Sequence, residues 1–181
     1  NKPAIVLEQE SDIWLALCMS IIGQQLSTKV ASIIKDRFID LLPKNKIDAK
    51  HVLMLEDEAL RAIGLSFAKV TYVKNVCLFF IEHKISDQKI HQLSDQEILD
   101  LLTQIKGVGQ WTVEMILMFA LGRENVFSHG DLGIQKAMIK LYNIQYQTKK
   151  ELQVKMIDIA QQWHPYKTYA CMYLWRYLDN K

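Results

Sequence analysis

The sequence is poor in the residues that interrupt helices and in cysteine. Its 181 residues include seven glycines, three prolines and three cysteines. So little glycine and proline argues against turn-rich all-β folds, collagen-like repeats and flexible linkers. The cysteines Cys18, Cys77 and Cys171 are odd in number and far apart. With no Cys-x-x-Cys pair or Cys/His cluster, they are interpreted as buried reduced thiols rather than as disulfides or metal ligands.

Long apolar runs and a strong charge of one sign are also missing. The longest uncharged stretch, Ile13–Thr28, turns polar in its second half and falls short of the ~20 apolar residues that span a bilayer. The N-terminal residues are acidic, so no secretory signal is expected. A net charge of +2 argues against a polybasic tail but permits a locally basic face that binds nucleic acid.

Helical periodicity runs through the whole sequence, and no segment alternates as a β-hairpin would. We therefore predict one all-α domain over residues 1–181, with about ten helices. Trp14 and Trp163 are predicted to lie in the core. The predicted N-terminal caps and first-turn residues are Ser11 or Asp12, Ser27, Ser94 with Glu97, Thr148 with Glu151, and Pro165.

Two glycines separated by one residue interrupt a pair of these helices. One helix is expected to end near Ile105, and the next to run from Gln110 to Gly122, so that a helical hairpin spans about residues 102–122. Consecutive backbone N–H groups at such a helix start bind phosphate. Gly107 and Gly109 let a phosphate approach where a Cβ would obstruct it. By itself the motif favours an ordinary turn between helices, in which the glycines serve the geometry of the turn alone.

A single aspartate, Asp131, stands immediately before the amphipathic run Leu132–Tyr142. As a helix N-cap, such a side chain contributes about 1 kcal/mol to stability. A fixed carboxylate can also stabilise positive charge that develops in a transition state. The two roles are compatible.

With the hairpin and Asp131 in this order, the sequence resembles the helix–hairpin–helix DNA glycosylase superfamily, and within it the DNA-3-methyladenine glycosylase II family. The likeness covers about residues 12–178. It implies an all-α, two-lobed fold with the active site in a cleft between the lobes, without the N-terminal β domain of some larger relatives. Further matching stretches are Ile21–Ser27, Gly64–Ser66 with Lys69 and Tyr72, Trp163–Tyr166 and Tyr173–Arg176.

The resemblance assigns roles to several residues. Asp131 matches the catalytic aspartate. Trp111 stands where bifunctional relatives have a Schiff-base lysine, so no lyase activity is expected. Trp111 and Trp175 match aromatic positions of the base pocket, and Met115 stands where some relatives have a pocket aromatic. The alternative for both tryptophans is a packing role in the core. His129 is interpreted as a loop histidine.

The resemblance also implies a DNA-binding surface and no cofactor. Gln25 matches the wedge that fills the gap left by a flipped nucleotide, and Gln24 is a rival for that role. The other expected DNA contacts are Ser27, Lys106, Gly107, Val108, Gly109, Gln110 and Thr112. A monovalent cation can accompany the hairpin through the carbonyls of Thr103, Ile105 and Val108.

The expected function is that of a monofunctional DNA glycosylase that excises alkylated purines. Its expected partner is damaged double-stranded DNA, and it is expected to be a monomer, away from membranes, in a bacterial cytoplasm or a nucleus. One alternative is a glycosylase for deaminated or etheno bases. Another is a non-catalytic scaffold that binds duplex DNA, although such a module has no use for a carboxylate facing phosphates.

Overall fold

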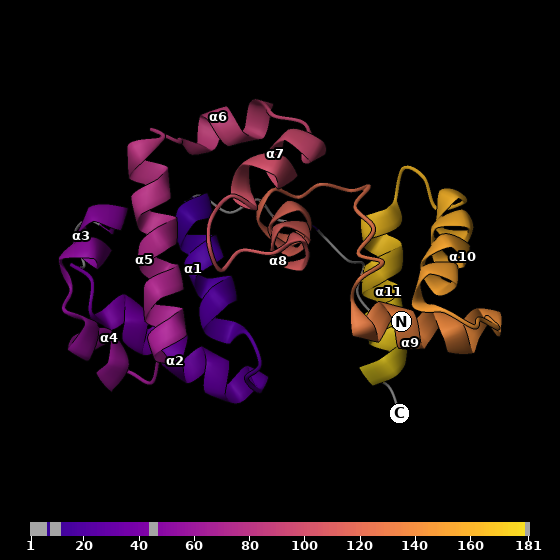
Figure 1. Cartoon of the computed structure of the whole chain (residues 1–181), viewed down its shortest axis with the longest axis horizontal. Coiled ribbons are helices and arrows are strands. Elements are labelled where there is room, and N and C mark those ends of the chain that lie inside the picture. Colours follow the sequence, from indigo (N-terminus) through magenta and orange to yellow (C-terminus); the bar gives the residue numbers. More distant parts are fainter. Residues whose placement is uncertain (1–6, 8–11, 44–46, 180–181) are drawn as a thin grey trace. The chain divides into compact units, whose positions relative to one another are not determined.

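The computed structural model describes residue 7 and residues 12–43 and 47–179. The described residues form helices and no strands, as the sequence predicts (Figure 1). The α-helices are α1 (Ile13–Gly23), α2 (Thr28–Asp40), α3 (Ala49–Met54), α4 (Asp57–Ala62), α5 (Phe67–Glu82), α6 (Asp87–Gln92), α7 (Asp95–Leu102), α8 (Gln110–Met115), α9 (Leu132–Tyr142), α10 (Lys149–Gln161) and α11 (Lys167–Asp179). A π-helical turn, η1 (Ile116–Ala120), continues α8.

The chain divides into two compact units, with the boundary between Ile116 and Leu117. We call the part that contains α1–α8 the N-terminal unit and the part that contains α9–α11 the C-terminal unit. None of the described helices is both long and apolar enough to cross a membrane.

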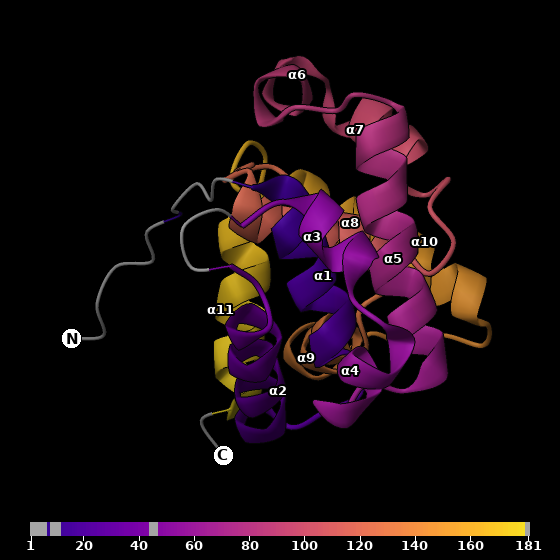
Figure 2. The same cartoon turned by 90° about the vertical axis from the view of Figure 1, so that its left-hand side faces the viewer.

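Helices α1 and α5 form the centre of the N-terminal unit. They pack against each other, α2 and α8 also contact α1, and α3 contacts α5 (Figures 1 and 2). Helix α1 is almost wholly apolar, which suits a helix buried on most of its sides. Cys18 on α1 and Cys77 on α5 are buried free thiols, as predicted, and burial raises the pKa of Cys18. Trp14 lies in this core, also as predicted.

The prediction that the side chain of Asp12 caps α1 is wrong. Asp12 adopts a left-handed backbone conformation and its side chain caps nothing. The carboxylate of Asp87 instead accepts hydrogen bonds from the backbone N–H groups of Asp12 at 2.7 Å and Ile13 at 3.0 Å. A carboxylate distant in sequence therefore satisfies the start of α1. Ser11 lies outside the described residues.

Other predicted caps are confirmed. The Ser27 hydroxyl accepts the Val30 N–H at 3.4 Å, and Ser94 and Glu97 form a reciprocal capping box. Thr148 caps α10 by accepting the Glu151 N–H at 3.1 Å. These interactions span three residues, so the local sequence is sufficient to specify them.

In the C-terminal unit, α9 packs against α11. The thiol of Cys171 on α11 is buried and forms no disulfide, as predicted. Two predictions fail here. Pro165 precedes α11 rather than lying in its first turn. Trp163 is half-buried, with its ring centroid 5.6 Å from that of Phe127 in an edge-on contact. Trp163 is therefore a partly exposed packing residue rather than a core residue.

Candidate DNA-binding turns and candidate active site

The residues predicted to act on DNA fall into two groups, one in each unit. In the N-terminal unit the exposed ones are Gln25, Ser27, Lys106, Gly109, Gln110 and Trp111, the half-buried ones are Gln24, Gly107 and Met115, and the buried ones are Val108 and Thr112. In the C-terminal unit Asp131 and Trp175 are both half-buried. Each group is described within its own unit.

The predicted hairpin is present as α7, a short turn and α8. We call Thr103–Gly109 the hairpin turn. Ile105 and Val108 anchor it, with 2% and 5% of their surface exposed, and the Val108 N–H donates to the Ile105 carbonyl at 3.0 Å. Lys106 and Gly109 lie on its outer side. The turn therefore has an apolar inner side and an exposed backbone edge, which is the arrangement a phosphate-binding turn requires.

Gly107 is needed for a reason that the sequence did not reveal. Its φ is +105°, and a Cβ built there would lie 2.2 Å from the Tyr72 ring of α5. At Gly109 a Cβ would meet nothing within 4 Å. Tyr72 is therefore the reason for a glycine at position 107, and contact of Gly107 with a phosphate stays a prediction. Gly107 leaves space for Tyr72, whereas Gly109 is the glycine with open space beside it.

The carbonyls predicted to bind a monovalent cation belong to the hairpin turn. The Ile105 carbonyl accepts the Val108 N–H, while Thr103 is exposed beside it. Cation binding by Thr103, Ile105 and Val108 stays a prediction. Among the described residues, no cluster of three or more His, Cys, Asp or Glu side chains is arranged to hold a metal ion.

Helix α8 begins directly after the hairpin turn and presents Trp111. This indole is 42% exposed, so the alternative of a core tryptophan is wrong for it. Buried Glu114 accepts a hydrogen bond from the Gln110 amide at 2.8 Å. The last site residue on the helix, Met115, is half-buried.

A second turn, Gly23–Ser27, joins α1 to α2; we call it the wedge turn. The Gln24 side chain donates to the Thr112 hydroxyl of α8 at 3.2 Å, so the wedge turn is tied to the hairpin helix. Gln25 is exposed with φ +60°, and no hydrogen bond within the described chain restrains its side chain. The structure therefore distinguishes the two glutamines: Gln24 is a tether, and Gln25 projects.

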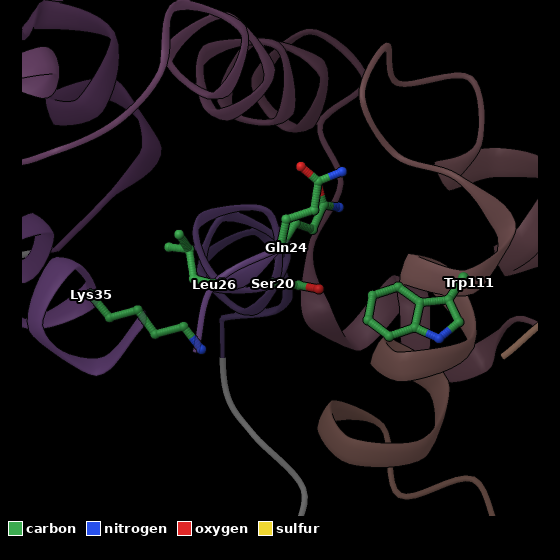
Figure 3. A pocket seen from close by; sticks show the side chains of 7 residues that line it. Ser20, Gln24, Leu26, Lys35 and Trp111 are labelled. Atoms are coloured by element: carbon green, nitrogen blue, oxygen red, sulfur yellow. The ribbon is translucent and has the colours of Figure 1, made fainter. Parts of the chain in front are cut away.

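A hollow of about 600 Å³ lies beside the wedge turn (Figure 3). Ser20, Gln24 and Trp111 line it together with Lys35 and Leu26. The side chain of Lys35 projects from α2 toward this hollow, and the sequence pattern did not single out this residue. The wedge turn, the Trp111 indole and the Lys35 ammonium group therefore share one surface of the N-terminal unit.

In the C-terminal unit Asp131 is the N-cap of α9. Its Oδ1 accepts hydrogen bonds from the Ile134 N–H at 2.8 Å and from the Trp175 indole N–H at 2.9 Å. A Cβ at Gly133 would lie 3.0 Å from Asp131 Oδ1 and 3.1 Å from Trp175 Cδ1. Gly133 therefore leaves the space in which indole and carboxylate meet.

A buried threonine holds helix α11 to the segment that precedes Asp131. Thr168 of α11 is fully buried; its hydroxyl donates to the Arg123 carbonyl at 2.6 Å and accepts the Val126 N–H at 3.0 Å. Helix α11, which carries Trp175, is thus fixed to the segment that leads to Asp131. Sequence reasoning missed Thr168, because a lone threonine in an amphipathic helix gives no signal of this contact.

Phe119 is a second residue that the sequence did not single out. Its ring is 41% exposed and lies 6.0 Å from Trp175, centroid to centroid, so that one indole contacts both an aromatic ring and a carboxylate. His129 is half-buried, as a loop residue: its carbonyl accepts a hydrogen bond from Gln135 at 2.9 Å, and its ring lies 6.4 Å from Phe127.

Comparison with known proteins adds a family to this geometry. A sequence model described as "HhH-GPD superfamily base excision DNA repair protein" matches residues 18–162. The chain is 28% identical over 173 residues to a Bacillus subtilis protein named putative DNA-3-methyladenine glycosylase YfjP, covering 92% of this chain and 59% of that protein. It is 32% identical over 162 residues to DNA-3-methyladenine glycosylase 1 of Schizosaccharomyces pombe, covering 88% of this chain and 70% of the yeast protein.

Solved structures agree with the sequence comparisons. The crystal structure of a Bacillus halodurans DNA-3-methyladenine glycosidase matches with a TM-score of 0.80 and 35% identity, over 95% of this chain and 78% of that one. The Schizosaccharomyces pombe 3-methyladenine DNA glycosylase Mag1, in complex with abasic DNA, matches with a TM-score of 0.82 and 28% identity, over 97% and 84% of the two chains.

Proposed function

This chain belongs to the HhH-GPD superfamily of base excision DNA repair proteins, and on that premise we propose that it is a monofunctional DNA glycosylase for alkylated purines. The names of its relatives support this substrate class. The observation that carries the proposal is the Asp131 carboxylate, which accepts hydrogen bonds from a helix N-terminus and from an indole at 2.8 and 2.9 Å. The proposed partner is damaged double-stranded DNA, bound by a monomer in a bacterial cytoplasm or a nucleus.

The proposed chemistry is hydrolysis of an N-glycosidic bond. The bond between C1′ of the deoxyribose and the purine nitrogen breaks, and its electron pair leaves with the base. Positive charge develops on the sugar, and a preorganised anion such as Asp131 stabilises it. Water adds to C1′ and loses a proton, for which the carboxylate is the acceptor. A purine alkylated on a ring nitrogen is already cationic and leaves as a neutral base, so no strong general acid is required.

Trp111 argues for hydrolysis without strand cleavage. A lyase step needs an amine that forms a Schiff base with the sugar. The residue just inside α8 is an indole, which offers none. An electron-rich indole instead favours a cationic base by roughly 0.5–2 kcal/mol through cation–π attraction. We assign Trp111, Met115 and Trp175 to recognition of the flipped base.

The two turns of the N-terminal unit are assigned to the DNA itself. The hairpin turn, with Lys106 and Gly109 on its exposed edge, is assigned to phosphates. Gln25 is assigned to the space that a flipped nucleotide leaves in the stack, because its side chain projects while Gln24 is bonded to Thr112. Ser27 and Gln110 are expected to contribute further polar contacts.

The test is release of free base under single-turnover conditions from duplexes that each contain one lesion. The panel contains methylated adenine, methylated guanine, hypoxanthine and ethenoadenine. We expect release of the methylated purines, with an intact strand bearing an abasic site. Release of only hypoxanthine or ethenoadenine would reassign the substrate class. Duplex binding that weakens with salt, without release of any base, would favour the scaffold function.

A further inference from the structure

One face of α5 contacts both turns that the proposed function assigns to DNA. Lys69 contacts the wedge turn, and Tyr72 and Asn75 contact the hairpin turn. These three residues lie three positions apart along α5, so they project from neighbouring points of one helix face. We call them the α5 face.

Lys69 makes the contact with the wedge turn. Its ammonium group donates to the Ile22 carbonyl at 2.8 Å and to the Gln24 carbonyl at 2.7 Å. Desolvation by burial lowers its pKa. Two of its three donors are therefore committed to the backbone at the end of α1, where helix carbonyls lack intrahelical partners and a cation is favoured.

The wedge turn needs such support because of its conformation. Gln25 has φ +60°, a left-handed value that is unfavourable for a residue with a Cβ. It immediately follows Gln24, the residue whose carbonyl Lys69 binds. For the Gln25 side chain to enter a base stack, the backbone of the wedge turn has to be held in a fixed conformation. Lys69 and the Gln24–Thr112 hydrogen bond supply that restraint.

The rest of the α5 face supports the hairpin turn in the same way. The Tyr72 ring occupies the space next to Gly107, and the Asn75 amide donates to the Lys106 carbonyl at 3.1 Å. A single rigid helix thus fixes the distance between the hairpin turn and the wedge turn. A protein that binds phosphates with one turn and inserts a side chain into the base stack from another needs a constant distance between the two turns.

We propose that the α5 face positions the two DNA-contacting turns, and that Lys69 is the positioning residue through which Gln25 stays poised to replace a flipped nucleotide. This inference rests on the proposed function. Its competitor is direct binding of a phosphate by Lys69. Positioning by Lys69 and direct phosphate binding by Lys69 predict different salt dependences of DNA binding. They also predict different rates of base release from lesions that need no wedge.

The experiment compares Lys69→Met with wild type on two duplexes. In one the methylated purine is paired with a normal base; in the other it lies opposite an abasic site, where there is no partner base to part from. Lys69→Met is expected to slow release from the paired lesion by about tenfold and to leave release from the unpaired lesion nearly unchanged. The matched control is Lys74→Met, which removes a lysine on the same helix that pairs with Asp57 and should change neither rate.

Salt dependence and a double-mutant cycle complete the test. The slope of log binding constant against log salt should not change in Lys69→Met, whereas loss of a phosphate contact lowers it by about one. If Lys69 acts through Gln25, the Lys69→Met/Gln25→Ala double variant loses no more than the larger single loss. If Lys69→Met does not fold, Lys69→Gln enters the same cycle.

Equal losses on both duplexes, additive losses in the cycle, or a lowered salt slope would each overturn the assignment. Failure of the proposed function looks different, because wild type itself would then release no base from either duplex.

Discussion

The indole N–H of Trp175 donates a hydrogen bond to Oδ1 of Asp131 at 2.9 Å. The same oxygen accepts the Ile134 N–H at 2.8 Å, so the carboxylate is oriented from its own helix and from α11. The sequence predicts that Trp175 offers a stacking surface for a flipped base. The hydrogen bond to Asp131 gives this indole a second role in the site. Its edge orients Asp131, and we propose that its face serves the base.

The Asp131→Asn variant tests the carboxylate itself. Asparagine caps helices about as well as aspartate, so thermal stability should be nearly unchanged. Loss of the preorganised negative charge should slow single-turnover release of a stable alkylated base by about 10²–10³-fold. The control is Asp158→Asn, an exposed carboxylate on α10, which should leave the rate unchanged. A folded Asp131→Asn protein with the wild-type rate would reduce Asp131 to a helix cap.

Trp175→Phe separates the two parts of the indole. Phenylalanine keeps an aromatic face but has no N–H, so Asp131 loses one of its donors. We expect excision about tenfold slower with little change in binding of product abasic DNA. Trp175→Ala, which also removes the aromatic face, should lose more with cationic bases than with neutral ones. Equal losses in excision and product binding would assign Trp175 to packing alone; Trp163→Phe controls for altered packing in the same unit.

Gly133→Ala should lower activity without lowering stability. Alanine in a helix is favoured over glycine by up to ~1 kcal/mol, so the melting temperature should hold or rise. Its Cβ would approach Asp131 Oδ1 to 3.0 Å, so indole and carboxylate must move apart slightly. Excision should slow by about tenfold, since catalysis depends steeply on such placement. Gly130→Ala, whose Cβ meets nothing within 4 Å, is the control and should excise normally.

Alanine substitutions at the two glycines of the hairpin turn should have different effects, one on stability and the other on DNA binding. Gly107→Ala combines a φ of +105° with a Cβ 2.2 Å from Tyr72, so it should destabilise the protein by about 1–3 kcal/mol in thermal unfolding. Gly109→Ala should leave stability nearly unchanged and weaken duplex binding, because its open side is the one available to a phosphate. Unchanged duplex binding by Gly109→Ala would remove the phosphate from that position.

The capping box of α7 predicts a pH dependence of stability. Hydrogen bonds from the Ser94 hydroxyl and backbone N–H hold the pKa of Glu97 below its ordinary value. A carboxyl whose folded pKa is depressed contributes stability above its unfolded pKa, and this contribution is lost as pH falls through the folded pKa. The stability advantage of wild type over Glu97→Gln at about pH 7 should therefore shrink by about pH 3. An advantage that stays constant would remove Glu97 as its source.

Local features of the sequence were enough to predict much of this protein. Helix starts at Ser27, Ser94 and Thr148 follow from side chains that bond to backbone N–H groups three residues away. The hairpin follows from two glycines between apolar helices, and the cap at Asp131 from an acidic residue before an amphipathic run. In each case the interacting groups are neighbours in the chain, so the pattern contains the interaction.

Only the tertiary structure decided the contacts between residues that are remote in sequence. Asp87 replaces the predicted cap of α1, Tyr72 explains Gly107, and Trp175 orients Asp131 from 44 residues away. Helical periodicity says which residues face inward but not which faces meet, because packing partners are chosen by the shapes of whole helices. For that reason the sequence indicated the carboxylate of the candidate site and its helix cap, and only the fold supplied the Trp175 indole that also holds it.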